Sequence, residues 1–432
     1  MLIEVQPKRA ASGAISQSGA MSQTIGRSRR GGKRMVGSGR GRLSVLAFTH
    51  FCVDFTCVFL LYAWFSGASD EARAFTSLVF VGYGVIAFGF QPLIGAIADV
   101  RRRLNLAVLG IVLLFPAFLC LNLPVLLVPA LGLGNACFHV AGGIDSLRLA
   151  KGRMARSGIF VSAGAPGVAL GVLLGGAGTT WMWMPGLLLV ACLVLTLVFV
   201  RDYQNLPIIE REGPERFRVA GDVHPFWLVI GVMAFVVFVR SLVGTIEPMP
   251  WKTGALLVLA AALAATAGKA LGGILADRLG AKTTAGVSLA LALPCLALGF
   301  AQPLFCCLGI ALLNMSMPIT LCALAQKLPH SPGLAFGITT LAILVGAFLP
   351  LPALPVPATL ILVSGLLLLT LPAVWLLLVD RKKDVFTLAG KRDGSGMVRE
   401  SRPLAVTAPK APLTPKAPLE GEPHESTVGT VR

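Results

Sequence analysis

Long uninterrupted stretches of apolar residues dominate the sequence, and short polar segments separate them. A helix rises 1.5 Å per residue, so a run of about 20 apolar residues crosses the roughly 30 Å hydrocarbon layer of a membrane. The runs lack the period-two alternation of membrane barrel strands, so helices are expected. The pattern predicts twelve membrane-spanning helices, at residues 43–65, 75–98, 104–122, 125–147, 157–177, 180–200, 225–247, 253–275, 283–300, 303–326, 333–350 and 358–379.

The connections between these runs define the expected domain organisation. The longest internal connection, 201–224, falls between the sixth and seventh runs. We therefore expect an N-terminal six-helix bundle over 43–200, a central cytoplasmic loop over 201–224 and a C-terminal six-helix bundle over 225–379. Residues 1–42 and 380–432 lack a core-forming pattern and are expected to be disordered cytoplasmic tails.

Composition excludes most soluble classes of protein. Hydrophobic residues make up 55% of the 432 residues and charged residues only 13%, about half the usual share. The 37 basic residues outnumber the 20 acidic ones, and the short loops on one side of the membrane hold most of the loop charge, whereas the other side holds only Arg73 and Lys252. The positive-inside rule then places both termini in the cytoplasm and the protein in the cell membrane. The scattered charge argues against nucleic acid as a partner.

Several kinds of chemistry have no supporting pattern. The nine cysteines all lie inside apolar runs, without the spacing of a disulfide framework or a zinc site, so no metal or cofactor is expected. The chain has no phosphate-cradling Gly-Lys-Ser/Thr loop, which argues against a built-in ATP motor. No short apolar stretch with a cleavage site precedes the first run, so we expect no removed signal peptide, and Met21 and Met35 are alternative starting positions.

Two similar motifs suggest an internal duplication. Gly95-Ala-Ile-Ala-Asp99 is followed by three arginines, and Gly273-Ile-Leu-Ala-Asp277 is followed by Arg278. The two motifs lie 178 residues apart in equivalent places of the two halves. Asn135 and Asn314 repeat with a similar offset. A duplicated six-helix unit is typical of transporters with two pseudo-symmetric bundles.

These motifs resemble those of the major facilitator superfamily, over roughly residues 43–380. Within it, His50-Phe-Cys-Val-Asp54, the segment from Gly132 to His139, and Arg240-Ser-Leu-Val are similar to the fosmidomycin-resistance branch. The resemblance implies an all-α membrane protein, with twelve helices in two pseudo-symmetric bundles around a central cavity that opens alternately to either side. It also implies proton-coupled export of a small organic compound by a monomer in the lipid bilayer. Uptake of an organic anion together with protons is the alternative.

Ionisable residues within the runs are expected to mark the transport pathway, because a charged group in hydrocarbon costs several kcal/mol unless it faces a cavity or a partner. Asp54 lies about 17 Å into the first run, and His50 shares its helix face. Asn135 and His139 share a face of the fourth helix in the same way. We expect Asp54, His139 and His50 to couple protons, with Asp54 as the carrier. The alternative is a permanent structural hydrogen bond at Asp54.

Four polar residues are candidate substrate-binding groups: Asn135, Arg240, Gln91 and Asn314. Three roles are open for Arg240, which is always charged. It binds an anionic group of the substrate, pairs with Asp54 or Glu247, or extends to the outer surface. Lys269 is expected to reach the cytoplasmic surface or to stabilise a closed gate.

Gating and packing residues complete the expectations. The two duplicated loops are expected to act in gating, through contacts of their acids with helix N-termini. Small residues in the fifth helix permit close packing between helices. A more specific interpretation is that they form an interface that prevents leakage through an exchanger. An intramembrane enzyme using His50 and Asp54 is disfavoured, since no nucleophile or metal cluster accompanies them. The gating set is Asp99, Arg101, Arg103, Asp277, Arg278 and Lys282, and the packing set is Gly164, Pro166, Gly167 and Gly171.

Overall fold

The computed structural model describes residues 39–101, 105–206 and 217–380. These residues are almost entirely helical, apart from loops and one isolated antiparallel bridge between Ala220 and Leu378. The first helix begins at Gly39, four residues before the predicted run. Most of the two predicted tails and Arg103 lie outside the described residues.

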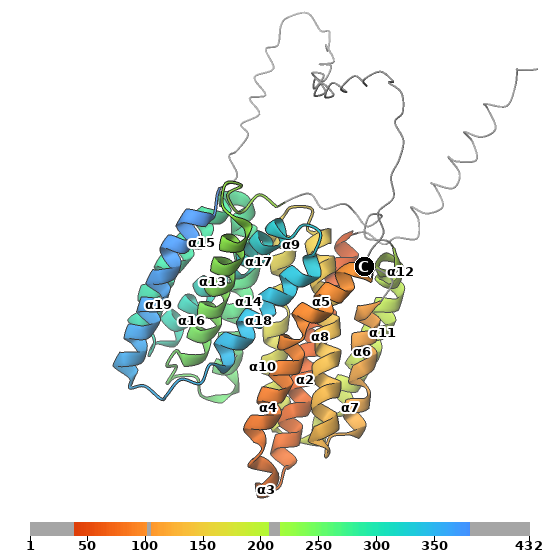
Figure 1. Cartoon of the computed structure of the whole chain (residues 1–432). Coiled ribbons are helices and arrows are strands. Elements are labelled where there is room, and N and C mark those ends of the chain that lie inside the picture. The colour runs from red at the N-terminus through yellow and green to blue at the C-terminus, as the bar shows by residue number, and fades with distance from the viewer. Residues whose placement is uncertain (1–38, 102–104, 207–216, 381–432) are drawn as a thin grey trace, which may run out of the picture. The chain divides into compact units, whose positions relative to one another are not determined.

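The first half of the protein comprises the elements up to residue 205 (Figure 1). Its helices are α2 (Gly39–Gly67), α3 (Asp70–Arg73), α4 (Thr76–Gly84), the π-helix η1 (Val85–Gly89), α5 (Gln91–Val100), α6 (Leu106–Leu114), α7 (Pro116–Leu119), α8 (Pro124–Leu149), α9 (Met154–Ser162), α10 (Gly164–Gly176), the 3₁₀ helix η2 (Thr179–Trp181), α11 (Trp183–Phe199) and α12 (Arg201–Asn205).

The second half begins at α13. Its helices are α13 (Phe226–Ile246), α14 (Gly254–Leu279), α15 (Ala281–Ala297), α16 (Pro303–Asn314), α17 (Ser316–Lys327), α18 (Pro332–Phe348) and α19 (Val356–Leu377). Among the described residues, nine helical segments are long and apolar enough to cross a membrane. Three shorter apolar segments, Leu106–Leu119, Ala281–Ala297 and Pro332–Phe348, coincide with the remaining predicted runs. The predicted all-helical membrane fold is confirmed.

Prolines explain why several predicted spans are interrupted. A proline has no N–H group and its ring clashes with the carbonyl four residues earlier. Pro166 follows Ser162, where α9 ends, by four residues, and Pro318 follows Asn314, where α16 ends, by the same spacing. Pro92 has the same relation to Phe88, which lies in the π-helix. Each proline interrupts the regular pattern of backbone hydrogen bonds within a membrane span, while the backbone at Ala163 and Met315 keeps right-handed helical dihedral angles.

The helices of the first half pack closely because α10 presents glycines to α2. A Cβ atom at Gly171 would lie 2.8 Å from the carbonyl oxygen of Phe55, and one at Gly167 or Gly175 would also collide with the α2 backbone. Side chains at these positions would force the two helices apart. Gly167 and Gly171, two of the predicted packing residues, therefore lie where α10 meets α2.

The most extensive contacts between the two halves are those of α5 with α18 and of α9 with α14. A Cβ atom at Gly333 would lie 2.5 Å from the Gly95 carbonyl oxygen, and one at Gly158 would lie 2.7 Å from that of Lys269. These contacts occur where Asp99 and Asp277 lie, which we call the Asp99 end and which is uppermost in Figure 1. The opposite end, which carries α3 and Glu247, is called the Glu247 end.

Candidate functional site

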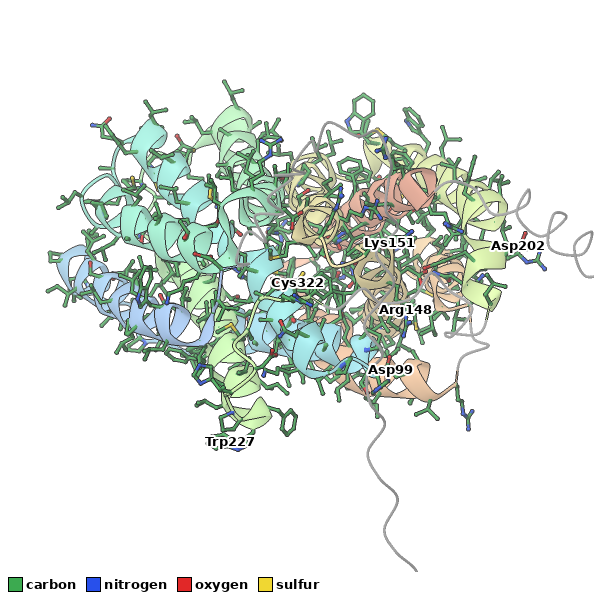
Figure 2. The ribbon with its side chains drawn as sticks, turned by 90° about the horizontal axis from the view of Figure 1, so that it is seen from above. Asp99, Arg148, Lys151, Asp202, Trp227 and Cys322 are labelled. Carbon is green, nitrogen blue, oxygen red and sulfur yellow. The ribbon has the colours of Figure 1, made fainter. Side chains whose placement is uncertain are left out.

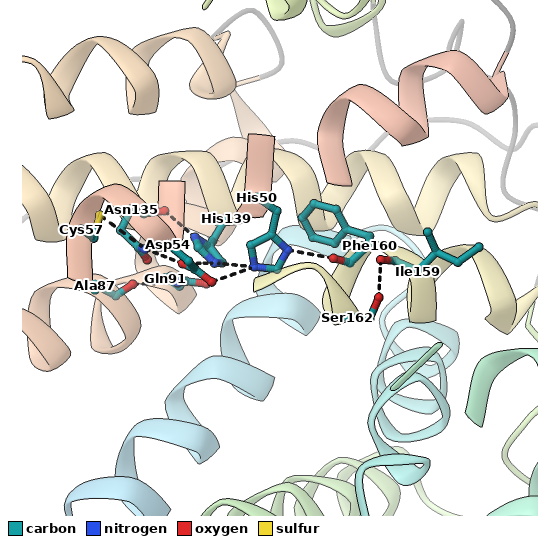
Figure 3. A network of polar contacts seen from close by, with 10 residues as sticks. All are labelled: His50, Asp54, Cys57, Ala87, Gln91, Asn135, His139, Ile159, Phe160 and Ser162. Carbon is teal, nitrogen blue, oxygen red and sulfur yellow. Dashed lines mark hydrogen bonds and ion pairs between the residues drawn. The ribbon is translucent and has the colours of Figure 1, made fainter. Parts of the chain in front are cut away.

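Three ionisable side chains converge inside the first half, and we call them the buried trio: His50 and Asp54 of α2 and His139 of α8 (Figure 3). The Nε2 atoms of His50 and His139 lie 2.9 Å apart. Each also lies 3.3 Å from a different carboxylate oxygen of Asp54. The four-residue spacing on α2 places His50 and Asp54 on one face, and α8 packs against that face. The structure therefore brings together all three residues that the sequence assigns to proton coupling.

Polar neighbours hold the trio in place. Asn135 donates from Nδ2 to Asp54 Oδ1 at 3.1 Å, so one predicted substrate-binding residue also supports the carboxylate. Gln91 is fully buried and donates to the Ala87 carbonyl oxygen in its own helical segment, while its Oε1 has no hydrogen-bond partner among the described residues. Asn135 thus belongs to the trio's surroundings, whereas the hydrogen bond of Gln91 goes to Ala87.

The backbone contacts of the two histidines fix their tautomers. His50 Nδ1 lies 2.8 Å from the Phe160 carbonyl oxygen, and His139 Nδ1 lies 2.9 Å from that of Asn135. A carbonyl oxygen only accepts, so each Nδ1 must carry a hydrogen and donate it. In the neutral state both Nε2 atoms would then present lone pairs. Their 2.9 Å separation is a hydrogen-bond distance, and it requires one additional proton between the rings.

The trio also contains residue types that bind metal ions, since one ligand atom from each lies within 4.8 Å of the others. Zinc–nitrogen bonds of 2.0–2.1 Å in a tetrahedral site place two histidine nitrogens about 3.3 Å apart. The observed Nε2–Nε2 distance of 2.9 Å is shorter. The spacing therefore fits a shared proton better than a metal ion, and we assign no metal ligands here.

Arg240 of α13 lies in the interior of the protein. Its side chain is only 6% exposed, its Nη2 donates to the Met317 sulfur at 2.6 Å, and its Nη1 has no hydrogen-bond partner among the described residues. Lys269 of α14 is half-buried and lies within electrostatic range of both Arg240 and Asp54. Within the described residues, neither Asp54 nor Glu247 forms an ion pair with Arg240. The guanidinium is therefore a buried cation that pairs with no carboxylate of the described ranges.

Asn314 lies apart from the trio. It ends α16, donates to the Ile310 carbonyl oxygen of its own helix at 2.9 Å, and lines a cavity of about 290 Å³ toward the Glu247 end. None of the trio lines that cavity. Of the predicted substrate-binding residues, Asn135 thus contacts the trio, Gln91 bonds to Ala87, Arg240 bonds to Met317 and Asn314 lines the cavity.

The two duplicated acids join the halves at the Asp99 end, through what we call the latch contacts. Asp99 accepts hydrogen bonds from the backbone N–H groups of Gly333 and Leu334, both at 2.9 Å, at the start of α18. Figure 2 shows Asp99 where the helices of the two halves meet. A carboxylate at a helix N-terminus satisfies unpaired N–H groups and complements the helix dipole.

The second latch contact runs in the opposite direction. Asp277 of the second half accepts from the N–H groups of Met154 and Ala155, at 2.8 and 3.0 Å, at the start of α9 in the first half. Each half therefore supplies one acid and one helix N-terminus. The other gating candidates make different contacts: Arg101 and Arg278 are exposed, and the Lys282 ammonium lies 4.4 Å from the centre of the Trp375 ring.

Sequence reasoning missed two features of the site. One is the Phe160 carbonyl oxygen, because a backbone acceptor leaves no signal in residue type. The other is the position of Gly164, where a Cβ atom would lie 2.7 Å from His50 Nε2 and would collide with Asp54 Oδ2. The glycine-rich pattern around Pro166 marks α10 for close packing but does not reveal which neighbour Gly164 meets.

Two helical halves, joined by hydrogen bonds at one end and containing buried ionisable groups, indicate a membrane transporter. The family model described as "Major Facilitator Superfamily" matches residues 43–350. The chain therefore belongs to the Major Facilitator Superfamily, a family of transporters rather than enzymes. A comparison with curated protein sequences finds no match.

Solved structures share the fold at low sequence identity. The crystal structure of the human organic anion transporter MFSD10 (TETRAN) is 15% identical, with a TM-score of 0.56, over 78% of this chain and 99% of that one. A structure of the fucose:proton symporter FucP of E. coli is 14% identical, with a TM-score of 0.50, over 77% of this chain and 97% of that one. FucP in its outward conformation gives the same values. At these identities the likeness supports the fold alone.

Proposed function

We propose that this transporter couples proton movement to the transport of a small organic anion, with the buried trio as its proton site. The main support is the 2.9 Å contact between the Nε2 atoms of His50 and His139, which both act as hydrogen-bond acceptors when the rings are neutral. A proton held there makes one imidazole cationic, and the Asp54 carboxylate at 3.3 Å balances its charge. Asp54 is buried, so its ionised carboxylate is most stable when the neighbouring imidazole carries that proton and its positive charge.

Loss of the proton changes the forces within the trio. Two lone pairs would then face each other beside an ionised carboxylate, an arrangement with no attractive contact between the rings. The rings must move apart, and His50 is anchored to the Phe160 carbonyl on α9. The same helix begins at the N–H groups that Asp277 holds. Proton release is thereby coupled to a helix that takes part in a latch contact.

The buried cation Arg240 of the second half supports an anionic substrate. Removing a charged group from water costs several kcal/mol unless a partner compensates it. Arg240 has no carboxylate partner in the part of the chain that the structure describes, and Lys269 adds a second positive charge within electrostatic range. A carboxylate or phosphonate of the substrate would supply the missing partner, and the planar guanidinium suits such groups through paired hydrogen bonds.

We further propose export by proton antiport, following the resemblance to the fosmidomycin-resistance branch, by a monomer in the cell membrane with both termini in the cytoplasm. Uptake of the anion together with protons is the second candidate, and anion binding at Arg240 would serve it equally well. The two differ in the pH gradient that drives accumulation. In proteoliposomes, antiport accumulates substrate on the acidic side, whereas symport accumulates it on the alkaline side.

The proton site is tested by Asp54→Asn, which keeps the shape of the side chain and removes its charge. Purified protein is reconstituted with a pH-sensitive dye, and proton flux is followed on addition of monocarboxylates, dicarboxylates and phosphonates, fosmidomycin included. We expect anion-driven proton flux in the unaltered protein and its loss in Asp54→Asn. Asp70→Asn, which changes an exposed acid of α3, should behave like the unaltered protein. Undiminished coupling in Asp54→Asn would remove the trio from the mechanism.

The anion site is tested by Arg240→Gln and Arg240→Lys. Loss of a charge-assisted hydrogen bond costs about 1.5–3 kcal/mol, so the apparent affinity for anions should fall roughly ten- to a hundredfold in Arg240→Gln. Arg240→Lys should restore part of it, and Arg73→Gln, at an exposed site, should change nothing. Equal losses for anionic and cationic compounds would instead assign Arg240 a structural role.

A further inference from the structure

A cavity at the Glu247 end is separate from the trio and from Arg240. Its volume is about 290 Å³, near the lower end of the range for small-molecule sites. Alanine and valine side chains form most of its wall, including Val168 of α10 and Ala262 of α14. Only Glu247, Lys252 and Asn314 contribute ionisable or amide groups.

Glu247 is the unusual member of this lining. It follows the last residue of α13, and its side chain is 6% exposed. Both carboxylate oxygens are buried, and neither has a hydrogen-bond partner among the described residues. Lys252 lines the same cavity but is exposed to solvent. An acid removed from water without a donor is destabilised, and a cation bound in the cavity would relieve that cost.

The end of α13 strengthens the preference for a cation. The last carbonyl groups of a helix have no partners within it and carry a partial negative charge. Gly244 lies two residues before the last residue of α13 and also lines the cavity, and a Cβ atom there would meet nothing within 4 Å. Open space therefore lies beside both the carboxylate and the negative end of the helix.

The lining also distinguishes between kinds of cation. Inorganic cations such as Mg²⁺ and Ca²⁺ require six or more oxygen ligands. This cavity supplies one carboxylate and one side-chain amide within apolar walls. A primary ammonium needs only a few acceptors, and its hydrocarbon body gains from burial against alanine and valine.

We propose that this cavity is a second binding site, for a small organic ammonium ion whose charge is held by Glu247 and whose apolar body lies between α10 and α14. The site is independent of the proposed proton coupling. Its walls come from both halves, α10 from the first and α13, α14 and α16 from the second. A bound amine therefore separates the halves at the Glu247 end and slows any transport that requires them to close there.

Binding is measured directly by titration calorimetry on the protein in lipid nanodiscs, with 2-phenylethylammonium as the probe and uncharged 2-phenylethanol as its matched analogue. We expect the ammonium to bind and the alcohol to bind at least about tenfold more weakly. Glu247→Gln should weaken ammonium binding by a similar factor. Glu71→Gln, at an exposed acid of α3, should leave it unchanged.

A second variant keeps the proposal testable if Glu247→Gln does not fold. Gly244→Leu retains the carboxylate and fills the cavity, so it should abolish ammonium binding while leaving the protein monodisperse. The proposal is overturned if the unaltered protein binds no ammonium at millimolar concentration. It is also overturned if Glu247→Gln or Gly244→Leu binds as tightly as the unaltered protein, or if the alcohol equals the ammonium. Because binding is the readout, the result is independent of whether the trio couples protons.

Discussion

A single methyl group at Gly164 should break at least one contact between Asp54 and the two histidines of the buried trio. In Gly164→Ala the new Cβ atom would lie 2.7 Å from His50 Nε2, whereas ordinary contact begins at 3.4 Å. The ring or the helix must therefore shift by about 0.7 Å, and the Asp54 carboxylate, which lies closer still, must shift further. Such overpacking costs about 1–3 kcal/mol. A carboxylate displaced in this way leaves hydrogen-bond reach of at least one histidine.

The assay combines thermal unfolding in detergent with anion-driven proton flux in proteoliposomes. Gly164→Ala should lower the melting temperature modestly and abolish or strongly reduce proton flux. Gly176→Ala in the same helix is the matched control, because a Cβ atom there meets nothing within 4 Å. Alanine is the better helix former by at most about 1 kcal/mol, so Gly176→Ala should be neutral or slightly stabilising and fully active.

Full proton flux in Gly164→Ala, with a melting temperature equal to that of Gly176→Ala, would refute this reasoning. The trio would then tolerate the displacement of its carboxylate, and its close geometry would not be needed for coupling. Lost flux with an unchanged melting temperature would still agree with it, since the strain falls on the trio rather than on the helix pair.

Two further predictions concern the latch contacts and the broken helix. Asp99→Asn and Asp277→Asn should each weaken two charge-assisted hydrogen bonds and shift the protein toward opening at the Asp99 end. The double variant should show a larger shift. Distances between spin labels on α5 and α18 measure this opening, and unchanged distances would contradict the prediction. Pro166→Ala restores an N–H group that can donate to the carbonyl oxygen of Ser162, so α9 and α10 should become one continuous helix. The protein should then be more stable and transport more slowly. Faster transport by a more stable protein would contradict a role for the break.

The sequence is sufficient to predict the helices but not their interruptions. Apolar length alone locates the membrane spans, because it reflects the thickness of the bilayer. The break between α9 and α10 depends on a proline that also occurs in continuous helices: Pro129 lies inside α8 without ending it. Whether the clash breaks the helix depends on what the neighbouring helices supply to the freed groups, and sequence reasoning does not contain that information.

The candidate site could also be predicted only in part. The spacing of His50 with Asp54 and of Asn135 with His139 predicts two polar faces, and the structure shows that they face each other. The tautomers depend on backbone carbonyls, and the buried state of Glu247 depends on the walls of a cavity. Neither follows from residue types along one chain. The proton-coupling, binding and gating roles of these residues stay predictions.

The latch contacts have one more consequence. Four amide hydrogens, those of Met154, Ala155, Gly333 and Leu334, are shielded only while the two halves stay together at that end. Whenever the halves separate there, these amides meet solvent and exchange with deuterium. Deuterium exchange in peptides covering 154–155 and 333–334 therefore reports opening at the Asp99 end without any introduced label.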